Sequence, residues 1–287
     1  MRTLYLDCIS GVSGDMLLAA LIDLGADLAY IDNYLKSLPI DPFALSIETV
    51  NKRGISANQL IIELEENDHH HDHHHDHHHD HNHDHHHDHH HDHHHDHHHD
   101  HHHDHNHDHH HDHHHDHHRR AADILSMIET SDLPQRVKER SLNIFRAIAE
   151  AEGKIHGMDP KDVHFHEVGA MDSIIDVIGI CLALEHLEID TIYASPVPTG
   201  KGKVRMAHGL YPIPAPATAE LLIGIPLADL DVMGELTTPT GAGVLKALVT
   251  DFVPIGSMVI QKIGYGAGMK EFDHPNVLRA MLIEKKN

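Results

Sequence analysis

The feature that most constrains this chain is a histidine and aspartate repeat. From residue 69 to residue 118 the unit HHHD recurs every four residues, twice varied to HNHD. Such a tract has no apolar side chains to bury, so it cannot form a packed core. We therefore expect a disordered insertion, residues 69–118, within an α/β domain built from residues 1–68 and 119–287.

All of the chain's apolar residues, 40% of the sequence, lie outside the tract. About 237 residues remain there, a length that suits one large domain or two small ones. Predicted strands alternate with predicted helices, which indicates an α/β, or α+β, fold with a mixed sheet. The expected strands are residues 3–8, 43–51, 59–65, 191–194, 257–263 and 277–283, and the expected helices are residues 16–24, 28–37, 121–129, 133–152, 174–187, 218–222 and 243–249.

The charge balance disfavours nucleic acid and membrane partners. The formal charge is −24, and about half of that excess lies outside the tract. Contacts to phosphate backbones need clustered Lys and Arg, and the sequence has no long basic run. No apolar stretch approaches the ~20 residues of a membrane span. Two distant cysteines and no secretory signal predict a reducing, cytoplasmic location.

The tract predicts transition-metal binding. It holds 36 of the 42 histidines, and neutral imidazole is a good ligand for nickel, copper and zinc. Aspartate at every fourth position can accept imidazole N–H bonds. We expect several exchangeable ions per chain, nickel first among them. A solvated linker or a tag is the alternative, although tags are shorter and terminal. Ligands are expected from the first repeats onward: His69, His70, His71, His73, His74 and His75.

A glycine-rich turn between a strand and a helix is the first candidate site in the folded part. Gly11, Ser13 and Gly14 would present backbone N–H groups at a helix N-terminus, where anions bind. Asp7 and Asp15 flank this turn as candidate catalytic carboxylates, and we expect both to line one cleft beside it. A tight turn in which Asp15 caps the helix is an equally good interpretation. The chain lacks the GxxxxGK[ST] phosphate loop.

The second candidate is the segment HFHE with two aspartates behind it. His164 and His166 share one face of an extended segment, and Glu167 follows at once. Asp172 and Asp176 share a helix face if the helix begins early enough. Two imidazoles and a carboxylate make a plausible divalent-metal site or general base. A structural role for these histidines is the alternative.

Two further loops could hold an anionic ligand. Lys201 and Lys203 lie in a glycine-punctuated segment, although a mobile hairpin would have the same sequence. Thr240 and Gly241 lie in ELTTPTGAG, where a plain helix cap is the alternative. Residues 263–276 are expected to form a tight loop near a site.

Taken together, these segments resemble one known family. DCISGVSGDM, HFHEVGAMDSIIDVIG, VPTGKGKV, HGLYPIPAPAT, GELTTPTGAG and GYGAGMKEFDHPN occur in order, with a His-rich insertion after the first hairpin. This set is similar to the nickel insertion proteins of nickel-pincer cofactor biosynthesis.

The resemblance implies a substrate and partners. Such proteins insert Ni(II) into pyridinium-3,5-bisthiocarboxylic acid mononucleotide, forming the pincer complex that lactate racemase needs. The reaction is a cyclometallation by a nickel chelatase, of the lyase class, and uses CTP with Mn(II) or Mg(II). Fuller members continue beyond the point where this sequence ends, and the nucleotide site belongs to that C-terminal part. We therefore expect this chain to act with a C-terminal partner.

Three other functions remain open at this stage. A metal storage or buffering protein needs only the tract. A GTP- or ATP-driven nickel metallochaperone is disfavoured by the missing phosphate loop. A zinc hydrolase would centre on His164 and His166.

Overall fold

The computed structural model describes residues 2–64, 120–165, 171–206 and 209–285 of the chain. The chain divides into two units, residues 1–65 with 117–287, and residues 66–116. The second unit lies wholly outside the described residues, so the predictions made for the tract are not tested by the structure. The following concerns the first unit only.

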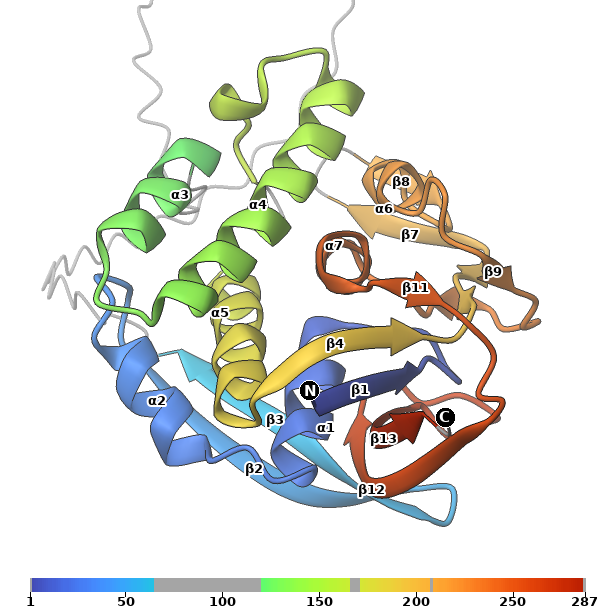
Figure 1. Cartoon of the computed structure of the whole chain (residues 1–287). Helices are drawn as coiled ribbons and strands as arrows, with labels where there is room; N and C mark the ends of the chain where they lie inside the picture. The colour runs from blue at the N-terminus through green and yellow to red at the C-terminus, as the bar shows by residue number, and fades with distance from the viewer. Residues whose placement is uncertain (1, 65–119, 166–170, 207–208, 286–287) are drawn as a thin grey trace, which may run out of the picture. The chain divides into compact units, whose positions relative to one another are not determined.

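A seven-stranded mixed sheet organises this unit (Figure 1). The strand order is β11-β4-β1-β13-β12-β3-β2. β1 pairs in parallel with β4 and antiparallel with β13, which confirms the predicted mixed α/β class. The strands are β1 (Arg2–Asp7), β2 (Phe43–Lys52), β3 (Ile55–Leu64), β4 (Ile189–Ala194), β11 (Asp251–Phe252), β12 (Met258–Ala267) and β13 (Val277–Lys285).

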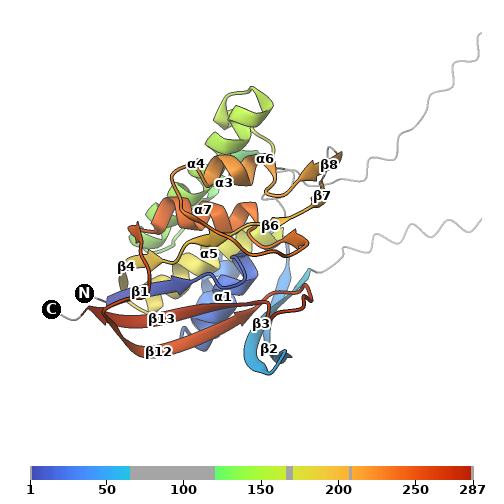
Figure 2. The same cartoon turned by 90° about the vertical axis from the view of Figure 1, so that its right-hand side faces the viewer.

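Helices cover one face of the sheet in two layers (Figure 2). α1 packs directly on the sheet, against β12 and β3. α5 lies against α1 and is buried almost all round, as expected of a helix that is apolar on every side. α4 packs on α5 and α7 farther out. The helices are α1 (Gly14–Asp23), α2 (Leu28–Lys36), α3 (Ala121–Thr130), α4 (Gln135–His156), α5 (Met171–His186), α6 (Pro216–Leu221) and α7 (Pro239–Leu248), with a 3₁₀ turn, η1, at Pro160–Asp162.

The prediction of a loop from residue 263 onward was wrong at its start. β12 continues to Ala267, and Gly264 and Gly266 lie within it. A Cβ on Gly266 would lie 1.8 Å from the Met16 carbonyl oxygen, and one on Gly264 would lie 2.3 Å from that of Ala20. These glycines therefore let α1 approach the sheet backbone closely instead of forming a turn.

The two faces of the sheet differ in what covers them. Leu4 and Leu6 of β1 belong to the main core under the helices. Tyr5 points the other way and is buried in a small cluster with Met281 and Ile283. Asp7 has the same parity as Tyr5 and therefore lies on this second face, away from α1.

Short strands connect the sheet to the outer helices. They form three two-stranded pairs beside the main sheet: β10 with β6, β5 with β9, and β7 with β8. None of the helices in the described ranges combines the length and apolar character needed to cross a bilayer. The bounds of these short strands are β5 (Val197–Pro198), β6 (Gly200–Lys201), β7 (Lys203–Met206), β8 (Gly209–Pro212), β9 (Leu227–Ala228) and β10 (Gly234–Glu235).

Candidate functional site

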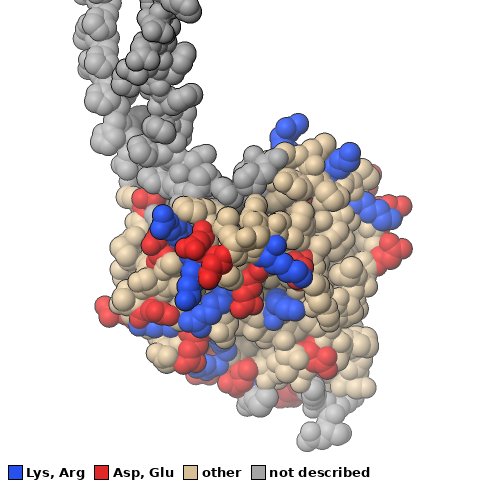
Figure 3. All heavy atoms as spheres, turned by 90° about the horizontal axis from the view of Figure 1, so that it is seen from above, with Lys and Arg blue, Asp and Glu red and all other residues tan. Residues whose placement is uncertain are grey.

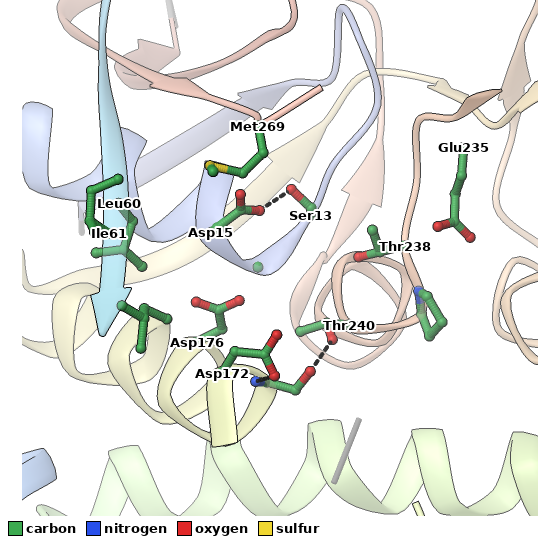
Figure 4. Close-up of a pocket in the computed structure, with 14 residues that line it drawn as sticks. Ser13, Asp15, Leu60, Ile61, Asp172, Asp176, Glu235, Thr238, Thr240 and Met269 are labelled. Carbon is green, nitrogen blue, oxygen red and sulfur yellow. Dashed lines mark hydrogen bonds between the residues drawn. The ribbon is translucent and has the colours of Figure 1, made fainter. Parts of the chain in front are cut away.

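A cleft of about 450 Å³ opens where the first turns of α1, α5 and α7 meet near β3 (Figure 4). Its wall is apolar on one side, with Leu60, Ile61 and Met269. The rest is polar and acidic, and it includes no Lys, Arg or His among the described lining residues. The polar lining side chains are Ser13, Asp15, Asp172, Ser173, Asp176, Glu235, Thr238 and Thr240.

The glycine turn and the ELTTPTGAG loop are joined by backbone contacts. The Val12 N–H donates to the Leu236 carbonyl at 3.0 Å, and the Thr238 N–H donates to the Val12 carbonyl at 3.1 Å. Gly11 has a φ of +82°, and a Cβ there would lie 2.1 Å from the Leu236 carbonyl oxygen. A Cβ on Gly241 would collide with Val12 in the same way, at 2.2 Å. The structure therefore brings two separately predicted loops to one place.

The first turns of α1 and α7 differ in how they are capped. Ser13 at the start of α1 makes no side-chain cap, and its hydroxyl donates to Asp15 Oδ1 instead. Thr238 at the start of α7 accepts a bond from the Gly241 N–H at 3.2 Å. The helix dipole is positive at the N-terminus of each helix, and the uncapped N-terminus of α1 therefore suits an anionic group.

Asp172 and Asp176 lie one turn apart on α5, because that helix begins at Met171 and not at residue 174. Their predicted common face is therefore confirmed. Asp172 Oδ1 accepts a bond from the Ser173 N–H at 2.7 Å. Asp176 lies deeper and is only 8% exposed. Gly14 makes room for it, because a Cβ there would lie 2.4 Å from Asp176 Oδ2.

The electrostatics single out Asp176. Burial raises the pKa of its carboxyl well above the ordinary value, and the charges of Asp15 and Asp172 raise that pKa further. Its Oδ1 is buried and has no hydrogen-bond partner. Burial also raises the pKa of Glu235, and the charge of Lys270 partly offsets this rise. The cleft thus gathers carboxyl groups in a poorly solvated place.

Other predicted site residues lie elsewhere. Asp7, expected to share a cleft with Asp15, forms an ion pair with Arg279 on the second sheet face and does not line the cleft. The prediction that Asp7 and Asp15 line one cleft was wrong, because strand alternation turns Asp7 away from α1. Lys201 lies at the surface, 3.1 Å from an Asp231 carboxylate oxygen. Lys203 lies exposed on β7.

The structure describes only some residues of the predicted histidine-centred site. His164 is exposed and forms a single β-bridge with Arg120. His166 and Glu167 lie outside the described residues. Within the described ranges, no group of three or more Asp, Glu, His or Cys side chains could hold a metal ion.

Three polar cleft residues were not singled out from the sequence. Glu235, Thr238 and Ser173 all line the cleft. Glu235 and Thr238 belong to the recognised ELTTPTGAG segment, and a threonine before proline is a common helix start. Ser173 gave no separate signal, because nothing in its local sequence shows which way it points.

The fold and the cleft define an α/β protein with a carboxylate-rich pocket at converging helix N-termini. The chain belongs to the nickel insertion protein family, which matches over residues 4–287. It is 51% identical over 278 residues to the pyridinium-3,5-bisthiocarboxylic acid mononucleotide nickel insertion protein of Staphylococcus saprophyticus, covering 97% of this chain and 59% of that one. It is 42% identical over 289 aligned positions to the protein of the same name from Geobacillus kaustophilus, covering 99% and 60%.

The chain thus spans about 60% of the length of the curated relatives it matches. No solved structure matches it.

Proposed function

We propose that this chain takes part in inserting Ni(II) into pyridinium-3,5-bisthiocarboxylic acid mononucleotide, the compound in its relatives' names. One observation carries the proposal. Segments 7–16, 171–179 and 234–243, far apart in sequence and all part of the family resemblance, contribute side chains to one cleft. Segments that converge in this way fit a common ligand better than separate structural roles do.

The cleft offers what the substrate's chemistry requires. The mononucleotide phosphate suits the uncapped N-terminus of α1, with the hydroxyls of Thr238 and Thr240 nearby. Its pyridinium ring would lie on the apolar wall of Leu60, Ile61 and Met269. Replacing a ring C–H bond by a C–Ni bond releases one proton, which a carboxylate can accept.

The histidine tract supplies nickel in this proposal. A dense row of exchangeable imidazoles suits storage and delivery, whereas a reaction centre needs rigidly held ligands. His164, His166 and Glu167 remain candidates for receiving the ion or the proton. We propose that the insertion of nickel takes place in the folded unit and not in the tract.

The relatives are longer than this chain, and the family resemblance implies further partners. We propose that a C-terminal part completes the activity and binds CTP with Mn(II) or Mg(II). Lactate racemase would receive the finished cofactor. The reaction would take place in the cytoplasm.

The decisive experiment is reconstitution. The chain should be incubated with nickel and the precursor, with and without the C-terminal part, and lactate racemase activation measured. Activation that requires this chain supports the proposal. Stoichiometric nickel binding with no effect on the precursor would instead favour a storage protein.

The histidine hypothesis has a separate test. His166→Ala should lower cofactor maturation by more than ~10²-fold if the residue is a general base. His156→Ala, at the end of α4, is the matched control. Thermal unfolding separates loss of function from loss of fold. A stable and fully active His166→Ala protein would remove this residue from the site.

A further inference from the structure

The loop between β12 and β13, residues 268–276, forms part of the cleft wall, because it carries Met269. Its end is bonded back to its beginning through Asn276, which is only 5% exposed. The Gly268 N–H donates to the Asn276 carbonyl at 3.1 Å, and Asn276 Nδ2 donates to the Lys270 carbonyl at 2.9 Å. Asn276 therefore sets the conformation of the segment on which Met269 lies.

The same loop is bonded to the glycine turn at Ser10, which is fully buried. The Ser10 hydroxyl lies 2.6 Å from His274 Nε2 and donates to Asn276 Oδ1 at 3.2 Å. From Ser10 the turn continues to Ser13 and Asp15, which line the cleft. The network of Ser10, His274 and Asn276 thus joins two segments that both contribute side chains to the cleft.

The hydrogen bonds decide which ring nitrogen of His274 carries hydrogen. Asn276 donates through Nδ2 to Lys270, so its Oδ1 faces Ser10 and must accept. The serine hydroxyl has a single proton, and that bond uses it. Ser10 Oγ can therefore only accept from His274, which means that Nε2 carries the hydrogen and that the lone pair of the neutral ring is on Nδ1.

A ring contact holds His274 in this orientation. Its imidazole stacks on Phe272, with centroids 5.5 Å apart and the planes inclined by only 2°. Arg53 Nε donates to the Phe272 carbonyl at 2.7 Å, and a Cβ on Gly234 would lie 3.0 Å from the Phe272 ring. The imidazole is therefore placed by the stack as well as by Ser10. It also lines a second cavity, of about 430 Å³.

We propose that His274 is a positioning residue for the cleft, whose Nε2–H holds Ser10 and Asn276 together and so fixes the start of α1 relative to Met269. This role needs the N–H at Nε2 and not the lone pair at Nδ1. Its value for catalysis rests on the proposed function. A phosphate at the N-terminus of α1 and a pyridinium ring on Met269 can be held at once only if these two segments keep a fixed separation.

Two substitutions of His274 separate its two nitrogens. Glutamine places an amide N–H close to the position of Nε2, whereas asparagine places one only near that of Nδ1. His274→Gln should therefore keep the bond to Ser10, and His274→Asn should lose it. His156→Asn, at the end of α4, is the matched control.

Amide hydrogen exchange followed by mass spectrometry measures this network in the full chain. We expect His274→Asn to exchange about 5- to 150-fold faster than wild type in peptides covering residues 8–15 and 268–276, the factor that corresponds to a buried polar group left without its partner. Peptides from α4 should be unchanged, and His274→Gln and the control should match wild type.

Ser10→Ala removes the same bond from its other end and should reproduce the exchange pattern of His274→Asn. This second variant keeps the test decisive if His274→Asn fails to fold. Wild-type exchange at residues 8–15 and 268–276 in either folded variant would overturn the proposal.

Cofactor maturation supplies the functional measurement. In the reconstituted reaction His274→Asn should be slower by about 10- to 100-fold, and His274→Gln should restore most of the rate. An equal loss in both variants would instead make Nδ1 the required atom and would overturn the positioning role. If the wild-type chain produces no cofactor, the proposed function fails, whereas the exchange comparison still decides whether His274 holds the turn.

Discussion

Replacing Gly14 with alanine should destabilise the folded unit, although alanine is the better helix former. Gly14 is the first residue of α1, and its φ lies outside the left-handed region, so alanine fits the backbone. Without any contact the change would stabilise by about 0.4–1 kcal/mol through the unfolded state. The new Cβ, however, would lie 2.4 Å from Asp176 Oδ2 and 2.7 Å from Asp176 Cβ.

The cost of this steric clash should exceed the stabilisation gained through the unfolded state. Asp176 Cβ is held by α5, so side-chain rotation alone cannot relieve the contact. Overpacking of this kind costs about 2 kcal/mol in the middle of its range, against a gain of about 0.7 kcal/mol, which leaves a net loss of about 1.3 kcal/mol. For a unit of this size that corresponds to a fall in Tm of roughly 3–5 °C.

Urea unfolding followed by circular dichroism measures the loss. The control is Gly256→Ala, where a Cβ meets nothing within 4 Å and φ also lies outside the left-handed region. The control should be unchanged or slightly stabilised. If Gly14→Ala also proves neutral or stabilising, α1 and α5 do not approach each other as described, and the cleft geometry fails with them.

Four other predictions follow from the tract and from buried groups. The chain should bind several nickel ions at pH 7.5 and release them toward pH 5, because protonated imidazole cannot bind metal; equilibrium dialysis giving one ion or fewer would contradict this. Deleting residues 69–118 should leave the fold intact and reduce activity mainly when nickel is scarce, and lost activity in excess nickel would place the tract in the site. In EDTA, Asp176→Asn should be more stable than wild type by a margin that is larger at pH 7.5 than at pH 5. The reason is that the raised pKa of Asp176, beside Asp15 and Asp172, gives the native state an advantage at low pH that is lost as pH rises; chemical unfolding at both pH values checks the sign. Burial raises the pKa of Cys8 and Cys181 to about 12, so neither should react with iodoacetamide at pH 8 until the chain unfolds, as mass spectrometry would show.

On the face shown in Figure 3, Lys and Arg side chains are interspersed with Asp and Glu instead of forming one basic patch. The absence of nucleic acid and membrane partners stays a prediction from composition.

The sequence by itself determined the elements and their class. Local residue patterns placed α2 and β2 at the residues where they begin, because these patterns depend only on near neighbours. The glycine turn before α1 and the loop before α7 were also recognised, since glycine and threonine mark such positions locally. The tract's capacity for metal stays a prediction, made from its composition alone.

Only the tertiary structure decided which of these segments meet. Gly14 and Asp176 are distant in sequence, and their contact depends on α1 lying against α5. Asp7 and Asp15 are close in sequence, yet one turns toward Arg279 and the other toward the cleft, because successive strand residues face opposite sides of the sheet. Likewise, Gly264 and Gly266 suggested a loop, whereas the approach of α1 explains them within a strand. Local patterns specify elements, but a site is made by distances between elements, and those are determined by packing.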